Sequence, residues 1–287
     1  MITKALVEKA LEEVAKEVDA STISKKNLRK FTDSEYDKRL YEFLQGTTGY
    51  YQKGLPLLIN KLQCKNIVEL GSREGVSTLC IWDKLADDAR FTTIDILRDQ
   101  RYCPEEMFED SRVKFIFGDV SDLSIFKEEL PLDIDFLFSD TVHCDRQISD
   151  EFEIYQHFLS DVALVGIDDI HLNDKHKFFE RIPYTKWDLT KLFHISGWGL
   201  FLYERKEPLT KEERILRAYK ASAMVWKRKA DDTEKALQKM DSRRPITILK
   251  NVIKKITPLY SLLTFIYNTY YGFMVKRKKG NKAFLKK

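Results

Sequence analysis

The sequence predicts an α/β protein with a Rossmann-like, seven-stranded and mostly parallel sheet that has helices on both faces. Apolar runs of five to seven residues alternate with longer helical or loop stretches between about residues 66 and 169. Such runs are apolar on both faces of the strand, which is typical of a parallel sheet covered on both sides. The chain has 287 residues, of which 43% are hydrophobic. That is enough for a full core and a ligand site, and it excludes collagen-like and fully disordered chains.

The elements follow from the spacing of the apolar residues. Helical spacing from Ile2 to Val18 predicts an amphipathic helix, and a second helical stretch is expected over about 34–62. Five strands are expected at NIVEL (66–70), FTTIDI (91–96), VKFIFGD (113–119), IDFLFSD (134–140) and ALVGIDD (163–169). Two more, WDLTKLFHI (187–195) and WGLFLYE (198–204), are separated by Gly197. Their short connection predicts an antiparallel end to the sheet.

The chain divides into four parts. Residues 1–53 are an N-terminal helical segment, 54–206 the sheet domain, 207–241 a long charged helix and 242–287 a basic tail. A stripe runs along the long helix at three- and four-residue steps, made of Ile215, Tyr219, Ser222, Trp226, Ala230, Thr233, Leu237 and Met240. The stripe fits a helix packed on its own domain and a coiled-coil seam between subunits equally well. A homo-oligomer through residues 208–241 therefore stays open.

The tail differs in charge from the rest of the chain. Residues 242–287 contain twelve Lys and Arg and no Asp or Glu, and the whole chain carries +4, so the first 241 residues carry −8. Between Lys255 and Lys276 lie 20 uncharged residues, which include a proline, a glycine and four tyrosines. Half-polar, Tyr-rich segments prefer the membrane interface, where neighbouring lysines contact anionic headgroups. We therefore expect a peripheral anchor on the cytoplasmic face of a membrane.

Two other partners of the tail are considered. Clustered Lys and Arg also neutralise nucleic-acid phosphates, but the long uncharged run disfavours a nucleic acid. A solvated basic terminus is the simplest alternative. A cytoplasmic location agrees with an N-terminus that has no apolar signal segment and with four dispersed cysteines that form no C-x-x-C pair.

A glycine turn and a helix start follow the first strand. The segment from Glu69 to Thr78, ELGSREGVST, leaves backbone N–H groups free at a helix N-terminus, and Gly71 and Gly75 allow a ligand to approach the backbone closely. Arg73 occupies the middle position, so the spacing is not the G-x-G-x-x-G of a dinucleotide site. Taken alone, the turn fits an ordinary strand–helix connection equally well.

The next two strands end in residues suited to a nucleoside. The second ends in Asp95, whose carboxylate can accept hydrogen bonds from ribose hydroxyls, and the third ends in Gly118-Asp119, where a carboxylate can accept one from an adenine amino group. Each acidic residue alone fits a loop carboxylate or a helix cap. Taken in order, these residues resemble the class I S-adenosylmethionine-dependent methyltransferases over about residues 54–204. The set is Glu69-x-Gly71-x-x-x-Gly75, then Asp95, then Gly118-Asp119.

This resemblance implies a cofactor and the residues that bind it. Gly71 and Ser72 would lie by the methionine part of S-adenosylmethionine, Asp95 would hold the ribose, and Asp119 would lie near the adenine. Ser77 fits a subset of the family in which this position binds the methionine carboxylate. Arg73 departs from the family, because many members have glycine there. The cofactor-binding set implied is Glu69, Gly71, Ser72, Gly75, Ser77, Asp95, Gly118, Asp119 and Asp140.

The fourth and fifth strands end in carboxylates. Asp140 ends the fourth, and Asp168-Asp169 end the fifth. Three carboxylates at neighbouring strand ends make an all-oxygen cluster that suits Mg²⁺ or another hard divalent cation, which can lower the pKa of a substrate hydroxyl. His143 follows Asp140 by three residues and is suited to remove the proton, because imidazole titrates near neutrality. The simpler alternative is a surface histidine and a helix-capping Asp pair.

The Asp-x-x-His and Asp-Asp pattern resembles the metal-dependent sugar O-methyltransferases, the group with the macrocin, mycinamicin and cephalosporin-hydroxylase-like proteins. The resemblance implies Asp140, Asp168 and Asp169 as Mg²⁺ ligands and His143 as the base. Catechol-type methyltransferases have a similar metal layout with Asn as the last ligand and Lys as the base, so Asp169 and His143 favour the sugar group.

The sequence thus predicts a Mg²⁺-dependent O-methyltransferase that uses S-adenosylmethionine to methylate a sugar hydroxyl. Together with the tail, it indicates a membrane-associated or polymeric surface glycan as acceptor, as in O-antigen polysaccharide assembly. One alternative is a small-molecule O-methyltransferase that the tail only localises. Another is a non-catalytic membrane scaffold of glycan assembly, which would have no need of the carboxylates and His143.

Overall fold

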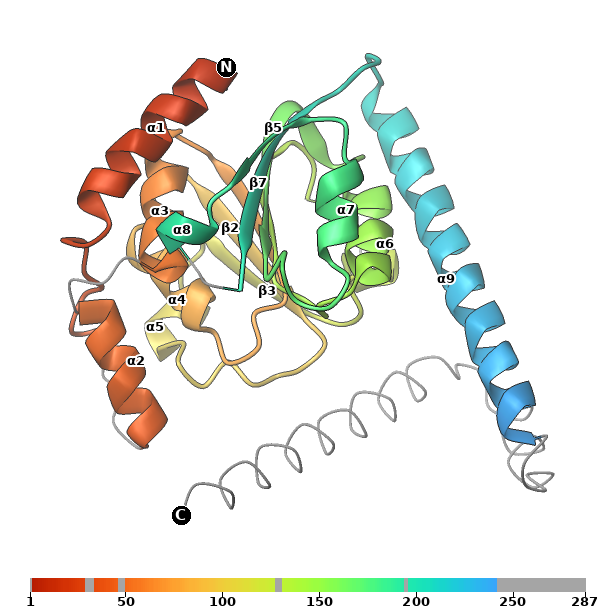
Figure 1. The fold of residues 1–287 in the computed structure, drawn as a ribbon, viewed down its shortest axis with the longest axis horizontal. Helices are drawn as coiled ribbons and strands as arrows, with labels where there is room; N and C mark the ends of the chain where they lie inside the picture. The colour runs from red at the N-terminus through yellow and green to blue at the C-terminus, as the bar shows by residue number, and fades with distance from the viewer. Residues whose placement is uncertain (1, 29–33, 46–49, 127–130, 194–195, 242–287) are drawn as a thin grey trace. The chain divides into compact units, whose positions relative to one another are not determined.

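The chain folds around a seven-stranded sheet with helices on both faces, seen in a computed structural model (Figure 1). The structure describes residues 2–28, 34–45, 50–126, 131–193 and 196–241. Residues Met1–Arg228 form one compact unit that contains the whole sheet, and Lys229–Lys287 form a second. The described part of the second unit continues the last helix.

The strands confirm the predicted fold class. Their order across the sheet is β3-β2-β1-β4-β5-β7-β6, and all neighbours are parallel except β7, which is antiparallel to both β5 and β6. The strands are β1 (Asn66–Leu70), β2 (Arg90–Asp95), β3 (Val113–Phe117), β4 (Ile134–Ser139), β5 (Leu159–Asp168), β6 (Thr185–Asp188) and β7 (Trp198–Glu204). Chain order reverses at β1, so β1 and β4 lie side by side in the centre.

Helices connect the strands and flank the sheet. They are α1 (Lys4–Glu17), α2 (Glu35–Gln45), α3 (Tyr51–Lys61), α4 (Val76–Asp83), α5 (Glu105–Phe108), the 3₁₀ helix η1 (Leu123–Phe126), α6 (Asp145–Tyr155), α7 (His176–Arg181), α8 (Thr190–Phe193) and α9 (Lys211–Asp241). The amphipathic helix predicted at the N-terminus is confirmed as α1. Its start is capped by Thr3, whose hydroxyl accepts the Leu6 N–H at 3.2 Å.

Two predicted elements are corrected. The helical stretch expected over 34–62 is two helices, because Tyr50 has an extended backbone, with φ −149° and ψ 151°, and α3 begins anew after it. The strand expected over 187–195 ends at Asp188. There the Asp188 carboxylate accepts the Thr190 N–H at 2.9 Å, a local bond that turns the chain into α8.

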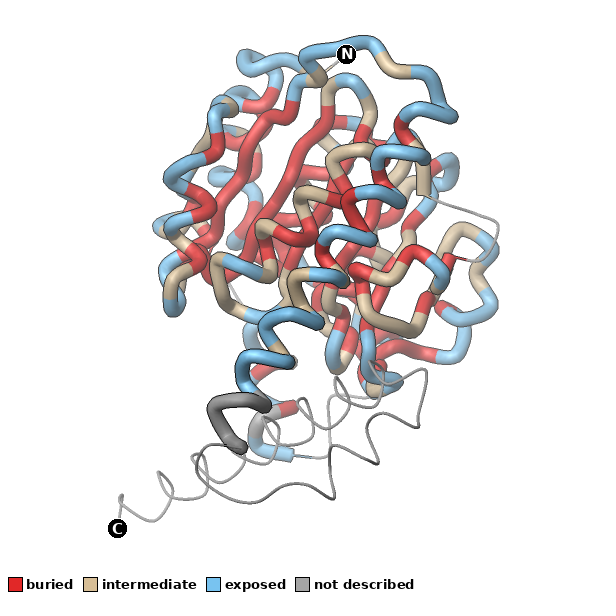
Figure 2. The backbone as a smooth tube through the Cα atoms, turned by 90° about the vertical axis from the view of Figure 1, so that its right-hand side faces the viewer, coloured by how far each residue is buried: buried red, intermediate tan, exposed pale blue. Residues whose placement is uncertain are grey.

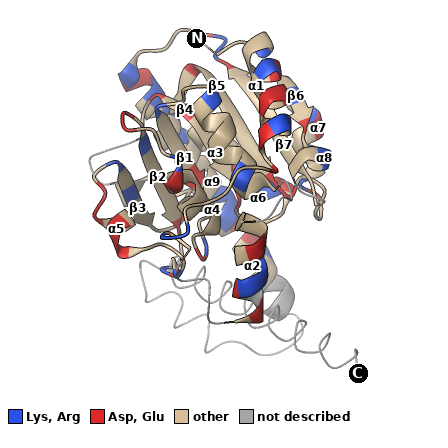
Figure 3. Ribbon diagram, turned by 90° about the vertical axis from the view of Figure 1, so that its left-hand side faces the viewer, with Lys and Arg blue, Asp and Glu red and all other residues tan. Residues whose placement is uncertain are grey.

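Two apolar cores lie on opposite faces of the sheet. One joins α1, α3, α4 and α8 to the sheet, and the other joins η1, α6, α7 and the first part of α9. Figure 2 shows the strands largely buried while the outer turns of the helices are exposed. Basic and acidic residues are interspersed along α1 and α2 (Figure 3), as expected for helices with a solvent-facing side.

The first part of α9 packs on its own domain. Ala218, Ala221 and Val225 are buried, whereas Tyr219 of the predicted stripe is 46% exposed. Ser222 of that stripe is buried, and Ser222 and Trp226 both donate to the Ser121 carbonyl, so the stripe overlaps the buried face in part. Leu216 and Met224 are also exposed, at 54% and 56%. A homo-oligomer through this helix stays a prediction.

The predicted membrane anchor, residues 242–287, lies outside the described residues. Within the part of the chain that the structure describes, no helix is both long enough and apolar enough to cross a membrane.

Arg214 fixes the start of α9 to the sheet, and its replacement should destabilise the fold. Its guanidinium donates to the carbonyls of His157, Phe158 and Leu159 at 2.8–3.1 Å and to Asp133 at 2.6 Å. We expect Arg214→Lys to lower the free energy of unfolding by about 2 kcal/mol, because the three donors of one ammonium nitrogen cannot replace the bonds that the guanidinium makes to four acceptors from three separate nitrogens. Urea unfolding followed by circular dichroism measures this loss. Arg217→Lys, at an exposed position on the same helix, is the control, and equal losses would contradict the prediction.

Candidate active site

The turn after β1 requires glycine at its first position. Gly71 has φ +91°, and a Cβ there would lie 2.3 Å from the carbonyl oxygen of Asp140. The Gly71 N–H donates to Ile94 at 2.8 Å, and the Asp140 N–H donates to Leu70 at 2.8 Å. The ends of β1, β2 and β4 are therefore joined at one point, where a ligand can approach the backbone.

The same turn explains how arginine replaces the glycine found in many methyltransferases. Arg73 has φ +46°, in the left-handed region that glycine adopts freely and other residues adopt at a cost of about 1 kcal/mol or more. Its N–H donates to the Asp95 carboxylate at 2.6 Å, which holds this conformation. Gly75 has φ +86° and caps the N-terminus of α4. Ser72, between them, is buried.

Asp95 ends β2 and Asp119 follows β3, and their binding of a nucleoside stays a prediction. Both oxygens of Asp95 accept backbone N–H groups, from Arg73 at 2.6 Å and Leu97 at 2.7 Å, which orients the carboxylate and leaves each oxygen a second acceptor position. Asp119 accepts the N–H and hydroxyl of Ser121 at 2.9 and 2.6 Å. The Gly118 N–H donates to the Asp95 carbonyl at 2.9 Å and so ties the ends of β2 and β3.

Glu69 supports the turn from the interior. Its carboxylate accepts hydrogen bonds from the hydroxyls of Ser77, Thr78 and Thr93, each at 2.6 Å. Burial raises the pKa of Glu69 to about 7, although these three hydrogen bonds act in the opposite direction. Glu69 and Ser77, both predicted to bind cofactor, thus bond to each other beneath the turn.

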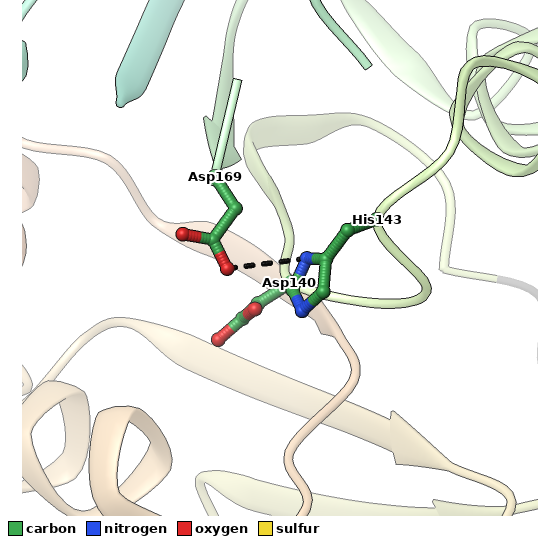
Figure 4. Close-up of side chains that lie close together, drawn as sticks. All are labelled: Asp140, His143 and Asp169. Atoms are coloured by element: carbon green, nitrogen blue, oxygen red, sulfur yellow. Dashed lines mark ion pairs between the residues drawn. The ribbon is translucent and has the colours of Figure 1, made fainter. Parts of the chain in front are cut away.

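Asp140, His143 and Asp169 come together at the ends of β4 and β5. One ligand atom of each lies within 4.8 Å of the others. Figure 4 shows the three side chains pointing toward one another, with Nδ1 of His143 3.2 Å from an Asp169 oxygen. Asp169 also accepts a hydrogen bond from the Ser196 hydroxyl. Its backbone has φ +57°, a conformation that Asp tolerates better than most residues.

Asp168 lies next to this trio but outside it. It is 3% exposed and ends β5, paired in register with Trp198. Burial, Asp140 and Asp169 together raise its pKa well above the usual range. Among the described residues, the structure therefore gathers two of the three predicted metal ligands and the predicted base.

Tyr51 is a site residue that the sequence did not indicate. It comes from α3, and its hydroxyl donates to Asp140 at 3.3 Å while its ring packs on Phe138 with centroids 5.9 Å apart. Burial and the nearby carboxylates raise the pKa of Tyr51 well above 10, so it stays a donor. A helix that precedes the sheet thereby contributes to the site.

Glu151 and Lys175 complete the charged surroundings, and neither was predicted. Glu151 on α6 accepts hydrogen bonds from Ser139, Thr141 and Gln147 at 2.5–2.7 Å. Lys175 precedes α7 and is fully buried. In the sequence it stands in the polar run NDKHK, which is typical of a solvated loop.

Burial dominates the electrostatics of the reactive groups. It raises the pKa of Asp140, against the effects of Lys175 and His143. It lowers the pKa of His143, against the attraction of Asp169, so the neutral imidazole is favoured. A neutral imidazole can accept a proton or bind a metal ion.

The donor set fits a divalent cation. The carboxylates of Asp140 and Asp169 are suited to Mg²⁺ or Mn²⁺. The imidazole of His143 adds a nitrogen ligand, which suits a transition-metal ion such as Mn²⁺ or Zn²⁺ better than Mg²⁺. Buried carboxylates this close also repel each other, which a cation would relieve.

Comparison with known proteins assigns the class. Residues 68–170 match the model of a family described as a methyltransferase domain. The match runs from β1 to just beyond β5 and contains every cofactor and metal residue named above. Fold, turn and match together identify a class I S-adenosylmethionine-dependent methyltransferase. No curated protein matches the chain.

Several solved structures are similar, at low identity. The SAH-bound methyltransferase PaMTH1 from Podospora anserina is 16% identical, with 72% of this chain and 98% of that chain covered and a TM-score of 0.48. An O-methyltransferase from Bacillus cereus with SAH is 18% identical, with 71% and 93% covered and a TM-score of 0.43. TomG from Streptomyces achromogenes, an O-methyltransferase of tomaymycin synthesis solved with SAM, is 19% identical, with 68% and 90% covered and a TM-score of 0.43. The reaction of this chain is therefore inferred from its own residues.

The raised pKa of Glu69 predicts a pH-dependent stability. Because the folded pKa of about 7 exceeds the usual 4.5, this group stabilises the fold fully below about pH 4.5, and the stabilisation is lost as pH rises through 7. We expect Glu69→Gln to remove this pH dependence, because the amide does not titrate. Between pH 5 and 8 the free energy of unfolding of the wild type should therefore fall by about 2–3 kcal/mol more than that of the variant.

Urea unfolding at pH 5, 6, 7 and 8 measures the difference. Glu12→Gln, at an exposed position on α1, is the matched control and should show no such divergence. Parallel pH profiles for wild type and Glu69→Gln would contradict the prediction.

Proposed function

We propose that the protein transfers the methyl group of S-adenosylmethionine to a hydroxyl group of a sugar. The observation that carries this proposal is the contact between His143 and Asp169, with Asp140 beside them. The His143 side chain is 37% exposed, so an acceptor hydroxyl can reach it, while the Asp169 side chain, at 11%, lies behind it. An imidazole beside a buried carboxylate is suited to act as a general base.

The orientation of His143 defines its part in the reaction. His143 Nδ1 lies 3.2 Å from an Asp169 oxygen but forms no hydrogen bond with it in this geometry. With the proton on Nδ1, beside this carboxylate, the Nε2 lone pair would be free to take the acceptor proton. The acceptor oxygen then bonds to the methyl carbon while the carbon–sulfur bond breaks and its electron pair returns to sulfur. The products are a methyl ether and S-adenosylhomocysteine. Asp169 stabilises the imidazolium that results, which releases its proton to water.

The carboxylates support a metal-assisted form of this reaction. Asp140, Asp168 and Asp169 would hold Mg²⁺ or another hard divalent cation, with His143 left as the base. Such an ion, when bound, lowers the pKa of the acceptor hydroxyl. Tyr51 orients Asp140 through its hydrogen bond at 3.3 Å.

The sugar acceptor is supported by the Asp-x-x-His and Asp-Asp pattern. We further propose a lipid-linked or polymeric glycan at an anionic, cytoplasmic membrane surface, supported by the twelve Lys and Arg and the absence of Asp and Glu in residues 242–287. A small-molecule hydroxyl is the alternative acceptor. Incubation with methyl-labelled S-adenosylmethionine and a panel of nucleotide sugars, lipid-linked glycans and catechols distinguishes them. Exclusive labelling of catechols would contradict the sugar proposal.

His143→Gln should slow methyl transfer without weakening cofactor binding. Loss of a general base costs about 10²–10⁴-fold in kcat, whereas the cofactor contacts lie at β1 and β2. Single-turnover methyl transfer measures the rate, and calorimetry measures the Kd of S-adenosylhomocysteine.

His176→Gln, a histidine outside the trio, is the control. Retained activity in His143→Gln would show that another group takes the proton. The Kd of Mn²⁺ is measured in the same samples, because a large loss of metal affinity would make His143 a ligand rather than the base.

Asp140→Asn, or chelation with EDTA, should abolish methyl transfer and largely spare cofactor binding. The substitution removes a negatively charged ligand, and EDTA removes the cation that this ligand would hold. Activity is measured with labelled S-adenosylmethionine before EDTA, after EDTA, and after addition of excess Mg²⁺ or Mn²⁺. Full activity in EDTA would refute the metal-assisted form and leave the His143 mechanism in place.

A further inference from the structure

Lys175 is a fully buried lysine at the edge of the candidate active site. Its exposed fraction is 0%, and its Nζ finds no hydrogen-bond acceptor among the residues that the structure describes. An ammonium buried without any compensation would cost several kcal/mol. Something in its surroundings must therefore balance the charge.

Two hydrogen bonds hold the segment before Lys175 against the loop that carries His143. The Asn173 side chain donates to the His143 carbonyl at 2.9 Å, and the Asp145 N–H donates to the Asp174 carboxylate at 2.9 Å. Arg181 of α7 also forms an ion pair with Asp145. The β5–α7 loop is thus fastened to the start of α6, which brings Lys175 to the ends of β4 and β5.

The charges that Lys175 meets there are carboxylates. Burial raises the pKa of Asp140, Asp168 and Glu151, and the positive charge of Lys175 acts in the opposite direction on all three. Glu151 and Asp168 are 1% and 3% exposed, so water screens this attraction weakly. The buried ammonium and the buried carboxylates therefore balance one another.

We propose that Lys175 is the resident cation of the carboxylate cluster. It balances Asp140, Asp168 and Glu151 before any ligand binds, so the site is assembled without a divalent ion. A divalent cation near Asp140 and Asp169 then adds to this charge and is repelled by it, which keeps the ion weakly held and exchangeable.

The test compares how much a divalent cation stabilises three forms of the full chain. Lys175→Met removes the ammonium and keeps the length of the side chain. Lys53→Met is the matched control, because Lys53 is also 0% exposed but its Nζ contacts the carbonyl of Asp19 rather than this cluster. Tm is measured in EDTA and in MnCl₂, and calorimetry gives the Kd of Mn²⁺.

We expect Mn²⁺ to bind Lys175→Met about tenfold more tightly than wild type, because a repelling charge is gone. We also expect the rise in Tm on adding Mn²⁺ to be at least about twice that of wild type and of Lys53→Met. A merely structural role would lower Tm equally in EDTA and Mn²⁺. If Mn²⁺ raises Tm equally in all three proteins, or in none, the proposal is wrong.

A second variant keeps the proposal testable if Lys175→Met does not fold. Lys175→Met combined with Glu151→Gln carries one buried carboxylate fewer, so it should fold and should still bind Mn²⁺ more tightly than Glu151→Gln alone. Equal Mn²⁺ affinities for those two proteins would overturn the proposal. These differences in Tm and Kd depend on the carboxylate cluster and not on the acceptor, so they would remain even if the wild type methylated no sugar.

Discussion

The site depends on negative charge held away from water at the ends of β4 and β5. Four carboxylates, those of Asp140, Glu151, Asp168 and Asp169, gather there, and burial is the main cause of the raised pKa of three of them. Such a cluster is stable only where each charge has donors or a cation. The donors and the cation come from helices and loops far apart in the sequence. They are Tyr51, Ser196, the three donors around Glu151 and the ammonium of Lys175.

Sheet order connects this cluster to the cofactor turn. Because β1 and β4 are neighbours, the Asp140 carbonyl lies where any side chain at residue 71 would clash, and the Asp140 side chain lies in the cluster. One residue therefore shapes the cofactor turn with its backbone and the reacting surface with its carboxylate. Parallel strands place such residues at one edge of a sheet, and the reversal of chain order leaves space there for a ligand.

Sequence reasoning succeeded where the pattern is local. The five parallel strands were predictable because a doubly covered strand is continuously apolar. The proximity of Asp140, His143 and Asp169 was predictable because they follow those strands directly, and their roles stay predictions. The break at Tyr50 and the end of β6 at Asp188 depend on backbone conformation and one side-chain hydrogen bond, which apolar spacing does not reveal. Tyr51 and Lys175 could not be predicted, because their roles depend on contacts between elements and their sequence neighbours resemble ordinary helix and loop.

The charge of the cofactor explains why the cluster needs cations of its own. A sulfonium is positive and becomes a neutral thioether when its methyl group leaves, so a field of unbalanced carboxylates would stabilise the reactant more than the transition state. A positive charge on the acceptor side of the cluster reverses that bias, because it stabilises the oxygen as it loses its proton. Lys175 offsets part of the carboxylate charge from within the fold, and in the proposed reaction the imidazole of His143, beside Asp169, would become positive as it takes the proton. The proposed reaction thus needs the cations as well as the carboxylates, because the cations limit how strongly the cluster stabilises the positive reactant.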